Sequence, residues 1–303
     1  MASDGERLVG DLLDQLDLEP LEQRLFRGSS RDLGGKSVFG GQVAGQAMVA
    51  ATRTVDPEQQ AHSMHGYFLR PGDMEAAIVY EVDNIRDGRS FATRRVQAIQ
   101  HGRPIFSMLA SFHVEEHGYT HQMAMPDVPD PETLASHDEL RRNWVDELDR
   151  VPESLREAVG REVAIDMRAV KPWNMLAPDK RDAVQHVWFK AKAPLPDDQA
   201  VHRAVLTYAS DFNLLATSLF PHGVSFFTPG MQMASIDHAI WFHRNLQMDE
   251  WLLYSMDSPG AQDARGLSRG LIFNRAGELV ASVAQEGLIR QRDNKPRSTP
   301  ENG

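Results

Sequence analysis

Apolar and polar residues alternate with the period of a β-strand in several stretches of the chain. The alternation is clearest in residues 104–114, where the apolar positions are Phe106, Met108, Ala110, Phe112 and Val114. A period of two predicts a strand with one buried face. Further runs predict antiparallel sheet, namely 62–70, 184–193, 231–244, 264–274 and 278–290, with turns at Asp87-Gly88, His101-Gly102 and Ala276-Gly277.

Helical spacing replaces this alternation in two stretches. Residues 42–55 are mostly small and predict a slim helix that a sheet can wrap closely, with one face formed by Val43, Ala47, Ala50 and Ala51. Residues 200–219 predict a second helix, whose apolar stripe is Val205, Tyr208, Phe212, Leu215 and Leu219. The charged residues 132–151, which follow a proline-marked connection, are also expected to be helical.

The order of these elements occurs twice along the chain. Aligning the turn at His101 with the turn at Ala276 keeps the two following strands in register, so that Ala110 corresponds to Gln285. A turn region is expected between residues 245 and 263 of the second copy. The sequence therefore predicts an α+β protein made of two tandem units, each a helix wrapped by an antiparallel sheet.

Composition and charge exclude several classes of protein. The 303 residues are 41% hydrophobic and 25% charged, which is typical of a water-soluble globular chain. The formal net charge of −11, without a basic patch, disfavours nucleic-acid binding. The sequence shows neither a signal peptide nor an apolar run of about 18 residues, so we expect a cytoplasmic protein without a membrane partner.

Cysteine is absent, which excludes disulfides and thiolate nucleophiles, so any covalent chemistry must use oxygen. His113, His117 and His121 have helical spacing, but they fall in an expected loop and no carboxylate arrangement completes a site. We therefore expect no bound metal.

Three polar side chains interrupt apolar patterns in the second half. Gln285 falls on the apolar face of the last predicted strand, and Asp211 falls on the apolar stripe of the second predicted helix. Ser235 shares a strand face with two methionines. A buried amide without a partner costs about 1–3 kcal/mol, so such groups need a structural or chemical reason.

A carboxylate, a hydroxyl and an amide together suit hydrolysis by water. The carboxylate can accept a proton from the water, while the hydroxyl and the amide fix its orientation for attack on a carbonyl carbon. This chemistry needs no second base, so His65 and His238 are interpreted as histidines that pack within strands.

Six blocks between residues 22 and 290 resemble, in order, the acyl-CoA thioesterase II family: GGQVAGQA, HSMHGYFLRPGD, YASDFNLLATSLFPHG, SIDHAIWFHR, EWLLYSMDSPGAQDARG and ASVAQEG. The resemblance implies a double hotdog fold and hydrolysis of fatty acyl-CoA to free fatty acid and CoA, without a cofactor. It assigns the catalytic aspartate, hydroxyl residue and glutamine to Asp211, Ser235 and Gln285. The family often has threonine at the second position, and Ser235 keeps the hydroxyl but lacks the methyl that restrains its rotamer.

The repeat and the resemblance together divide the chain into five expected segments. They are an amphipathic segment at 1–20, an N-terminal hotdog unit at 21–116, a linker with a charged helix at 117–160, a catalytic C-terminal hotdog unit at 161–292 and a disordered polar tail at 293–303. Because hotdog units pair through their sheets and exposed edges invite pairing, a homodimer or homotetramer is expected. Acyl-CoA is the expected substrate and fatty-acid metabolism the expected setting.

Other interpretations stay open at this point. Gly266–Gly270 matches the G-x-S-x-G string with Ser268 as nucleophile, but a hairpin is expected where that elbow needs a helix. Asp211-Phe212-Asn213 also resembles the start of the motif of hotdog enoyl-CoA hydratases, whose histidine would fall at Ala216. A non-catalytic acyl-CoA-binding module is the remaining alternative. Release of free thiol from a saturated acyl-CoA would separate a thioesterase from both.

Overall fold

The computed structural model describes residues 3–31, 33, 37–144 and 161–292. The predicted polar tail at 293–303 and residues 145–160 of the predicted linker lie outside this part. The helical elements described are α1 (Asp4–Leu16), α2 (Gly40–Thr52), η1 (Pro131–Thr133), α3 (His137–Trp144), α5 (Gln199–Ala209) and η3 (Leu215–His222). The strands are β1 (Glu19–Glu22), β2 (Leu25–Gly28), β3 (Gln60–Phe68), β4 (Ile78–Asp87), β5 (Phe91–Gln100), β6 (Arg103–His113), β7 (Ile165–Ala169), β8 (Val184–Ala191), β9 (Met231–Ser235), β10 (Asp237–Phe242), β11 (Leu252–Gln262), β12 (Arg265–Asn274) and β13 (Leu279–Gln291).

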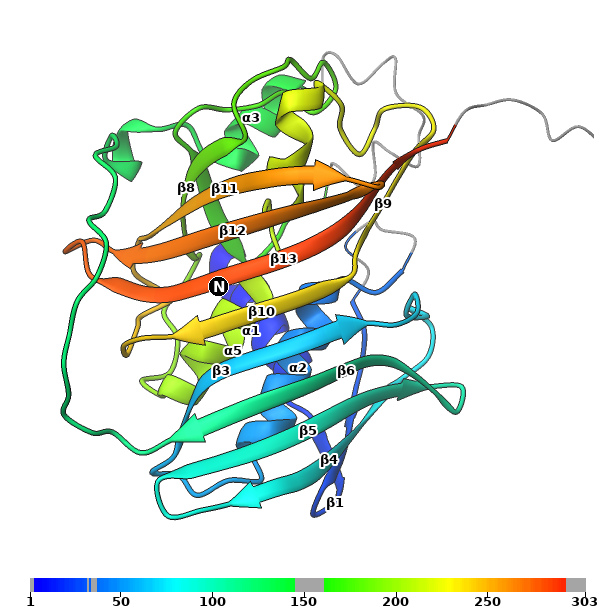
Figure 1. Ribbon diagram of the computed structural model, residues 1–303, viewed down its shortest axis with the longest axis vertical. Coiled ribbons are helices and arrows are strands. Elements are labelled where there is room, and N and C mark those ends of the chain that lie inside the picture. The colour runs from blue at the N-terminus through cyan, green and yellow to red at the C-terminus, as the bar shows by residue number, and fades with distance from the viewer. Residues whose placement is uncertain (1–2, 32, 34–36, 145–160, 293–303) are drawn as a thin grey trace, which may run out of the picture.

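One sheet runs through both halves of the described chain (Figure 1). Its order is β1-β2-β4-β5-β6-β3-β10-β13-β12-β11-β8-β7, and β9 pairs with the end of β13. The two halves meet at β3 and β10, which pair antiparallel with Met64 opposite Ile240. Outward from this junction both halves have the same arrangement, so that β6 corresponds to β13 and β5 to β12. This confirms the α+β fold with two related units that the repeat predicts.

Helices α2 and α5 lie side by side against one face of the sheet (Figure 1). Small residues allow this close packing: a Cβ on Gly45 of α2 would lie 3.3 Å from the carbonyl oxygen of Ala204 in α5. Inside the first unit, Gln46 of α2 accepts a hydrogen bond from the Tyr80 hydroxyl at 2.6 Å and donates to the backbone oxygen of Gln15 at 2.6 Å. The slim helix predicted from the sequence is therefore buried on nearly every side.

The N-terminal helix α1 seals the same core. Ser3 and Glu6 form a capping box at its start, and its buried side chains are Leu8, Val9, Leu12, Gln15 and Leu16. The described part of the predicted amphipathic segment thus packs against the core through Asp4–Leu16.

Three sequence-based expectations about secondary structure are wrong in detail. The helix predicted over 200–219 ends at Ala209, and η3 follows after a turn in which Asn213 has a φ of 65°. The strand predicted over 231–244 is interrupted at Ile236 and forms β9 and β10. The turn region expected between 245 and 263 contains β11, whose pairing with β12 is irregular between Asp257 and Gly260.

Candidate active site

Asp211 lies in the turn after α5 and points at the start of α2 in the other half of the molecule. Its Oδ2 accepts a hydrogen bond from the backbone N–H of Gly41 at 2.8 Å. The N-cap residue of α2, Phe39, supplies no side-chain hydrogen bond, so Asp211 satisfies one of the free donors at that helix end. The positive end of the helix dipole also favours a carboxylate there. The site is therefore assembled from both units.

Two glycines make this approach possible. A Cβ on Gly40 would lie 2.8 Å from Asp211 Oδ2 and 2.9 Å from the Phe68 ring, and a Cβ on Gly41 would lie 2.3 Å from the Tyr208 carbonyl oxygen. Any side chain at either position would displace the carboxylate or the facing helix. In the sequence this glycine pair directly precedes the helix predicted at 42–55, and sequence reasoning did not assign it to the site.

Gln285 brings the other two predicted residues together. Its side chain is 1% exposed, and its Nε2 lies 2.6 Å from Asp211 Oδ1 and 3.1 Å from Ser235 Oγ. Ser235 ends β9 opposite Gly287 of β13, so its hydroxyl lies on the same face as the amide. The carboxylate, the hydroxyl and the amide that the sequence singled out thus share one nitrogen atom as a common contact.

His238 also belongs to this polar cluster, a role that its interpretation as a histidine packing within a strand did not include. The side chain is 1% exposed, with Nδ1 3.2 Å from Gln285 Nε2 and Nε2 2.8 Å from Ser210 Oγ. The inward face of β10, on which it precedes Ile240 and Phe242, is the signal that could have found it. His65, by contrast, is exposed on β3 and packs edge-on against Trp241.

Hydrogen bonding assigns a neutral form to the His238 ring. Burial lowers the pKa of His238 below its ordinary 6.5, although the nearby Asp211 and Asp237 oppose this shift. Since Gln285 Nε2 can only donate, Nδ1 accepts, and the proton on Nε2 is donated to Ser210 Oγ. Ser210 in turn donates to the Thr207 carbonyl at 3.0 Å. A continuous chain of hydrogen bonds therefore fixes the orientation of His238.

The Gln285 side-chain nitrogen lies near more hydrogen-bond acceptors than it has hydrogens. Its Nε2 carries two hydrogens but has three acceptors within 3.2 Å, those of Asp211, Ser235 and His238. Turning the amide over would bring Oε1 against the Asp211 carboxylate, which is unfavourable while that group is charged. Gln285 can therefore release one acceptor without leaving a hydrogen unpaired.

Ser268 of the G-x-S-x-G string does not form a nucleophile elbow. It lies in the β12–β13 hairpin that the sequence predicted, opposite Gln285. Its Oγ is buried and has no hydrogen-bond partner among the described residues. Without a base at hydrogen-bond distance in that part of the chain, Ser268 lacks the activation that such a nucleophile needs.

Neither a metal-binding cluster nor a membrane-spanning helix occurs in the described residues. They contain no group of three or more His, Asp or Glu side chains that could hold a metal ion. No helix in the same residues is both long and apolar enough to cross a membrane.

Comparison with known proteins gives consistent matches over both halves. The family described as acyl-CoA thioesterase matches residues 161–288, and the acyl-CoA thioesterase N-terminal domain matches residues 29–113. Acyl-CoA thioesterase 2 of Haemophilus influenzae is 40% identical over 283 residues, which cover 93% of this chain and 98% of that protein. Acyl-coenzyme A thioesterase 8 of Homo sapiens is 38% identical and covers 91% of this chain and 87% of its own length.

Solved structures agree with these matches. The crystal structure of an acyl-CoA thioesterase II from Mycobacterium marinum is 43% identical, with a TM-score of 0.76 and coverage of 94% of this chain and 99% of that one. A hot dog fold protein from Alicyclobacillus acidocaldarius is 18% identical with a TM-score of 0.73, covering 93% of this chain and 99% of its own. At that identity the likeness concerns the fold alone, and it confirms the predicted double hotdog.

Proposed function

Because the chain belongs to the acyl-CoA thioesterase family, we propose that it hydrolyses fatty acyl-CoA to free fatty acid and CoA by direct attack of water. The observation that carries this proposal is the 2.6 Å contact between Asp211 Oδ1 and Gln285 Nε2, with Ser235 Oγ on the same nitrogen. Asp211 lies at the start of α2, where negative charge is favoured.

Asp211 acts as the general base. Its carboxylate accepts hydrogen bonds from Gly41 and Gln285, which fix its position and leave lone pairs for a water molecule. As this water attacks the carbonyl carbon, Asp211 takes its proton. Cleavage of the carbon–sulfur bond then gives the carboxylic acid, and the departing CoA sulfur takes up the proton. No side chain becomes acylated in this sequence of steps.

Ser235 and Gln285 hold the water for attack. The extra acceptor at Gln285 Nε2 means that one hydrogen can turn toward the incoming water while the other stays on Asp211. Ser235 supplies a hydroxyl that can donate or accept at the same point. Correct orientation of a bound water lowers the entropic part of the barrier without any change in chemistry.

The start of α2 stabilises the developing oxyanion. Negative charge builds up on the thioester carbonyl oxygen during attack, and oriented backbone dipoles in a preformed site stabilise it without reorganisation. Gly40 and Gly41 let the Asp211 carboxylate come close to this helix end, so the base and the positive end of the helix dipole lie together. His238 acts as a positioning residue, because it contacts Gln285 and not the proposed water.

Replacement of Asp211 by asparagine tests this mechanism. Asparagine cannot take the proton, and its single oxygen can accept from Gly41 or from Gln285 but not from both. We expect kcat for thiol release from saturated palmitoyl-CoA to fall by about 10²–10⁴-fold, the usual worth of a general base. The matched control is Asp257→Asn, which removes an exposed carboxylate paired with Arg269 and should leave the rate unchanged.

Thiol release from palmitoyl-CoA also separates a thioesterase from the two alternatives, an enoyl-CoA hydratase and a non-catalytic acyl-CoA-binding module. A hydratase acts on a double bond and a binding module does not turn over, so neither releases thiol from a saturated acyl-CoA. Near-normal turnover by a folded Asp211→Asn variant would reject Asp211 as the base while leaving thioesterase activity itself intact.

Several further expectations rest on the sequence alone. The unit boundaries at 21–116 and 161–292, a homodimer or homotetramer, a cytoplasmic location and a role in fatty-acid metabolism stay predictions.

A further inference from the structure

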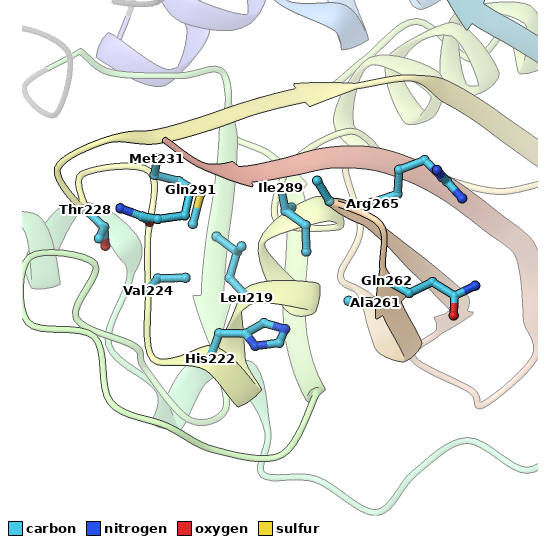
Figure 2. A pocket seen from close by; sticks show the side chains of 11 residues that line it. Leu219, His222, Val224, Thr228, Met231, Ala261, Gln262, Arg265, Ile289 and Gln291 are labelled. Atoms are coloured by element: carbon cyan, nitrogen blue, oxygen red, sulfur yellow. The ribbon is translucent and has the colours of Figure 1, made fainter. Parts of the chain in front are cut away.

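A cavity of about 570 Å³ lies in the second unit (Figure 2), and none of its lining residues belongs to the polar cluster. Its inner wall is apolar and is formed by Leu219 and Val224 on one side and by Met231 and Ile289 on the other (Figure 2). Polar side chains, among them Gln262 and Gln291, lie at its rim. Apolar walls with a few polar groups are typical of cavities that bind small amphipathic ligands.

The cavity lies on the strand faces that carry the catalytic residues. Side chains alternate along a strand, so Gln285, Gly287 and Ile289 of β13 share one face. In β9, Ser235 and Met231 likewise share a face, and the two strands pair with Ser235 opposite Gly287. Ile289 is four residues from Gln285, and Met231 is four residues from Ser235. At about 3.4 Å per residue, the cavity wall begins about 14 Å from the catalytic groups.

The strip of sheet between the polar cluster and the cavity contains Gly287 of β13 and Met233 of β9. A Cβ on Gly287 would lie 2.3 Å from Leu215 Cδ1, so the glycine leaves space on the sheet that the Leu215 side chain occupies. Met233 faces Ile289 across the strand pair and packs against the buried cluster of Leu219 and Phe220. The unbranched methionine side chain can repack around a flexible ligand.

We propose that this cavity receives the far end of the acyl chain and makes the protein a thioesterase selective for long chains. The proposal rests on the proposed function, because the thioester must lie at Asp211. A zigzag hydrocarbon with bonds of about 1.5 Å advances about 1.25 Å per carbon, so about 11 carbons span the 14 Å strip. An eight-carbon chain stops short of the cavity, whereas a sixteen-carbon chain places about five carbons inside it.

CoA itself does not suit this cavity. Arg265 is the one lysine or arginine among its lining residues, and its Nε already donates to Glu286 at 3.0 Å. The phosphate groups of CoA are best bound by several lysine or arginine side chains, and this lining holds only Arg265. The apolar wall matches the hydrocarbon end of the substrate instead.

The test compares kcat/KM for acyl-CoA substrates of different acyl-chain lengths in the full-length Val224→Phe variant and in the unsubstituted protein. The phenyl ring fills the cavity without touching the polar cluster, and Val184→Phe at the exposed start of β8 is the matched control. Thiol release is measured with octanoyl-CoA and palmitoyl-CoA below their micelle concentrations. Each buried methylene is worth about fourfold in affinity, so exclusion of several carbons predicts a loss of at least about tenfold in kcat/KM for palmitoyl-CoA. Octanoyl-CoA turnover and the control variant should stay within about twofold of the unsubstituted protein.

Equal losses for both substrates, or no loss for either, would overturn the proposal. A raised inhibition constant for free CoA in Val224→Phe would overturn it too, because it would place CoA in the cavity. If Val224→Phe does not fold, Ala261→Phe fills the cavity from the exposed end of β11 and must give the same profile. Failure of the proposed function is distinguishable, since the unsubstituted protein would then release no thiol from either substrate.

Discussion

Replacing Gln285 with glutamate would place two carboxyl groups in direct contact inside the protein. The two side chains have the same shape, and Nε2 of Gln285 is 2.6 Å from Asp211 Oδ1. Gln285 is 1% exposed, so solvent cannot screen the pair. The substitution therefore changes charge while leaving packing almost untouched.

The size of the effect follows from the distance. Two like charges at 2.6 Å repel by about 6 kcal/mol at an effective dielectric constant of about 20. That energy corresponds to a shift of several pKa units, so the pair keeps one shared proton at pH 7. With that proton in place, Asp211 is no longer a free base, and we expect kcat for thiol release to fall by at least about 10²-fold.

Stability should acquire a new dependence on pH. The introduced carboxyl has a raised pKa in the folded state and an ordinary value near 4.3 in the unfolded chain, so the folded state binds the extra proton. The stabilisation is therefore complete below about pH 4.3 and is lost as the pH rises toward the raised pKa, by about 1.4 kcal/mol per pH unit. Urea unfolding at pH 5, 6, 7 and 8 measures this slope. Gln97→Glu, on the outer face of β5, is the control.

Two outcomes would contradict the contact between residues 211 and 285 or the role of Asp211 as the base. If the unfolding free energy of Gln285→Glu followed the same pH dependence as the unsubstituted protein, the side chains of residues 211 and 285 could not be in contact. If the variant kept full activity at pH 7, a free Asp211 carboxylate could not be the base.

The remaining predictions concern His238 and Gly40. His238→Asn keeps an acceptor where Nδ1 faces Gln285, whereas His238→Gln keeps only a donor toward Ser210. We expect kcat of His238→Asn to stay within about threefold of the unsubstituted protein. We expect kcat of His238→Gln to fall about fivefold, which corresponds to about 1 kcal/mol for one hydrogen bond, and KM to stay unchanged in both variants. Equal losses in the two variants would show that His238 has only a structural role. Burial lowers the pKa of His238, so on acidification the unfolded chain takes up this proton before the folded protein does. The stability that the neutral ring provides is therefore lost as the pH falls below about 6.5. Between pH 6.5 and 5, the free energy of urea unfolding should fall less steeply for His238→Asn than for the unsubstituted protein. Gly40→Ala should reduce kcat/KM by about tenfold or more, because its Cβ would lie 2.8 Å from Asp211 Oδ2 and move the base, as a misplaced group of this kind does. Gly10→Ala in α1, where a Cβ meets nothing within 4 Å, is the control. It should keep full activity and raise the melting temperature, because alanine favours a helix more than glycine does. Full activity of Gly40→Ala would contradict the placement of Asp211.

Features that depend only on neighbours along the chain could be predicted from the sequence. The period of two in residues 104–114 identified β6, and the small residues after Gly40 identified a helix that a sheet could enclose. The same local rule placed Gln285 inward among apolar residues, because a strand alternates its faces whatever it pairs with. The duplicated order of elements revealed two related units for the same reason.

The end of the second helix and the closure of the site depend instead on contacts between distant segments. Residues 200–219 have helical spacing throughout, yet α5 stops at Ala209, because the next residues bond to distant parts of the molecule. The Tyr254 hydroxyl donates to the Ser210 carbonyl at 3.0 Å, and Gly41 donates to Asp211 across a separation of 170 residues. Contacts between groups so far apart along the chain leave no periodic trace in the sequence, so the glycine pair Gly40 and Gly41 became part of the site only once the two halves were packed together.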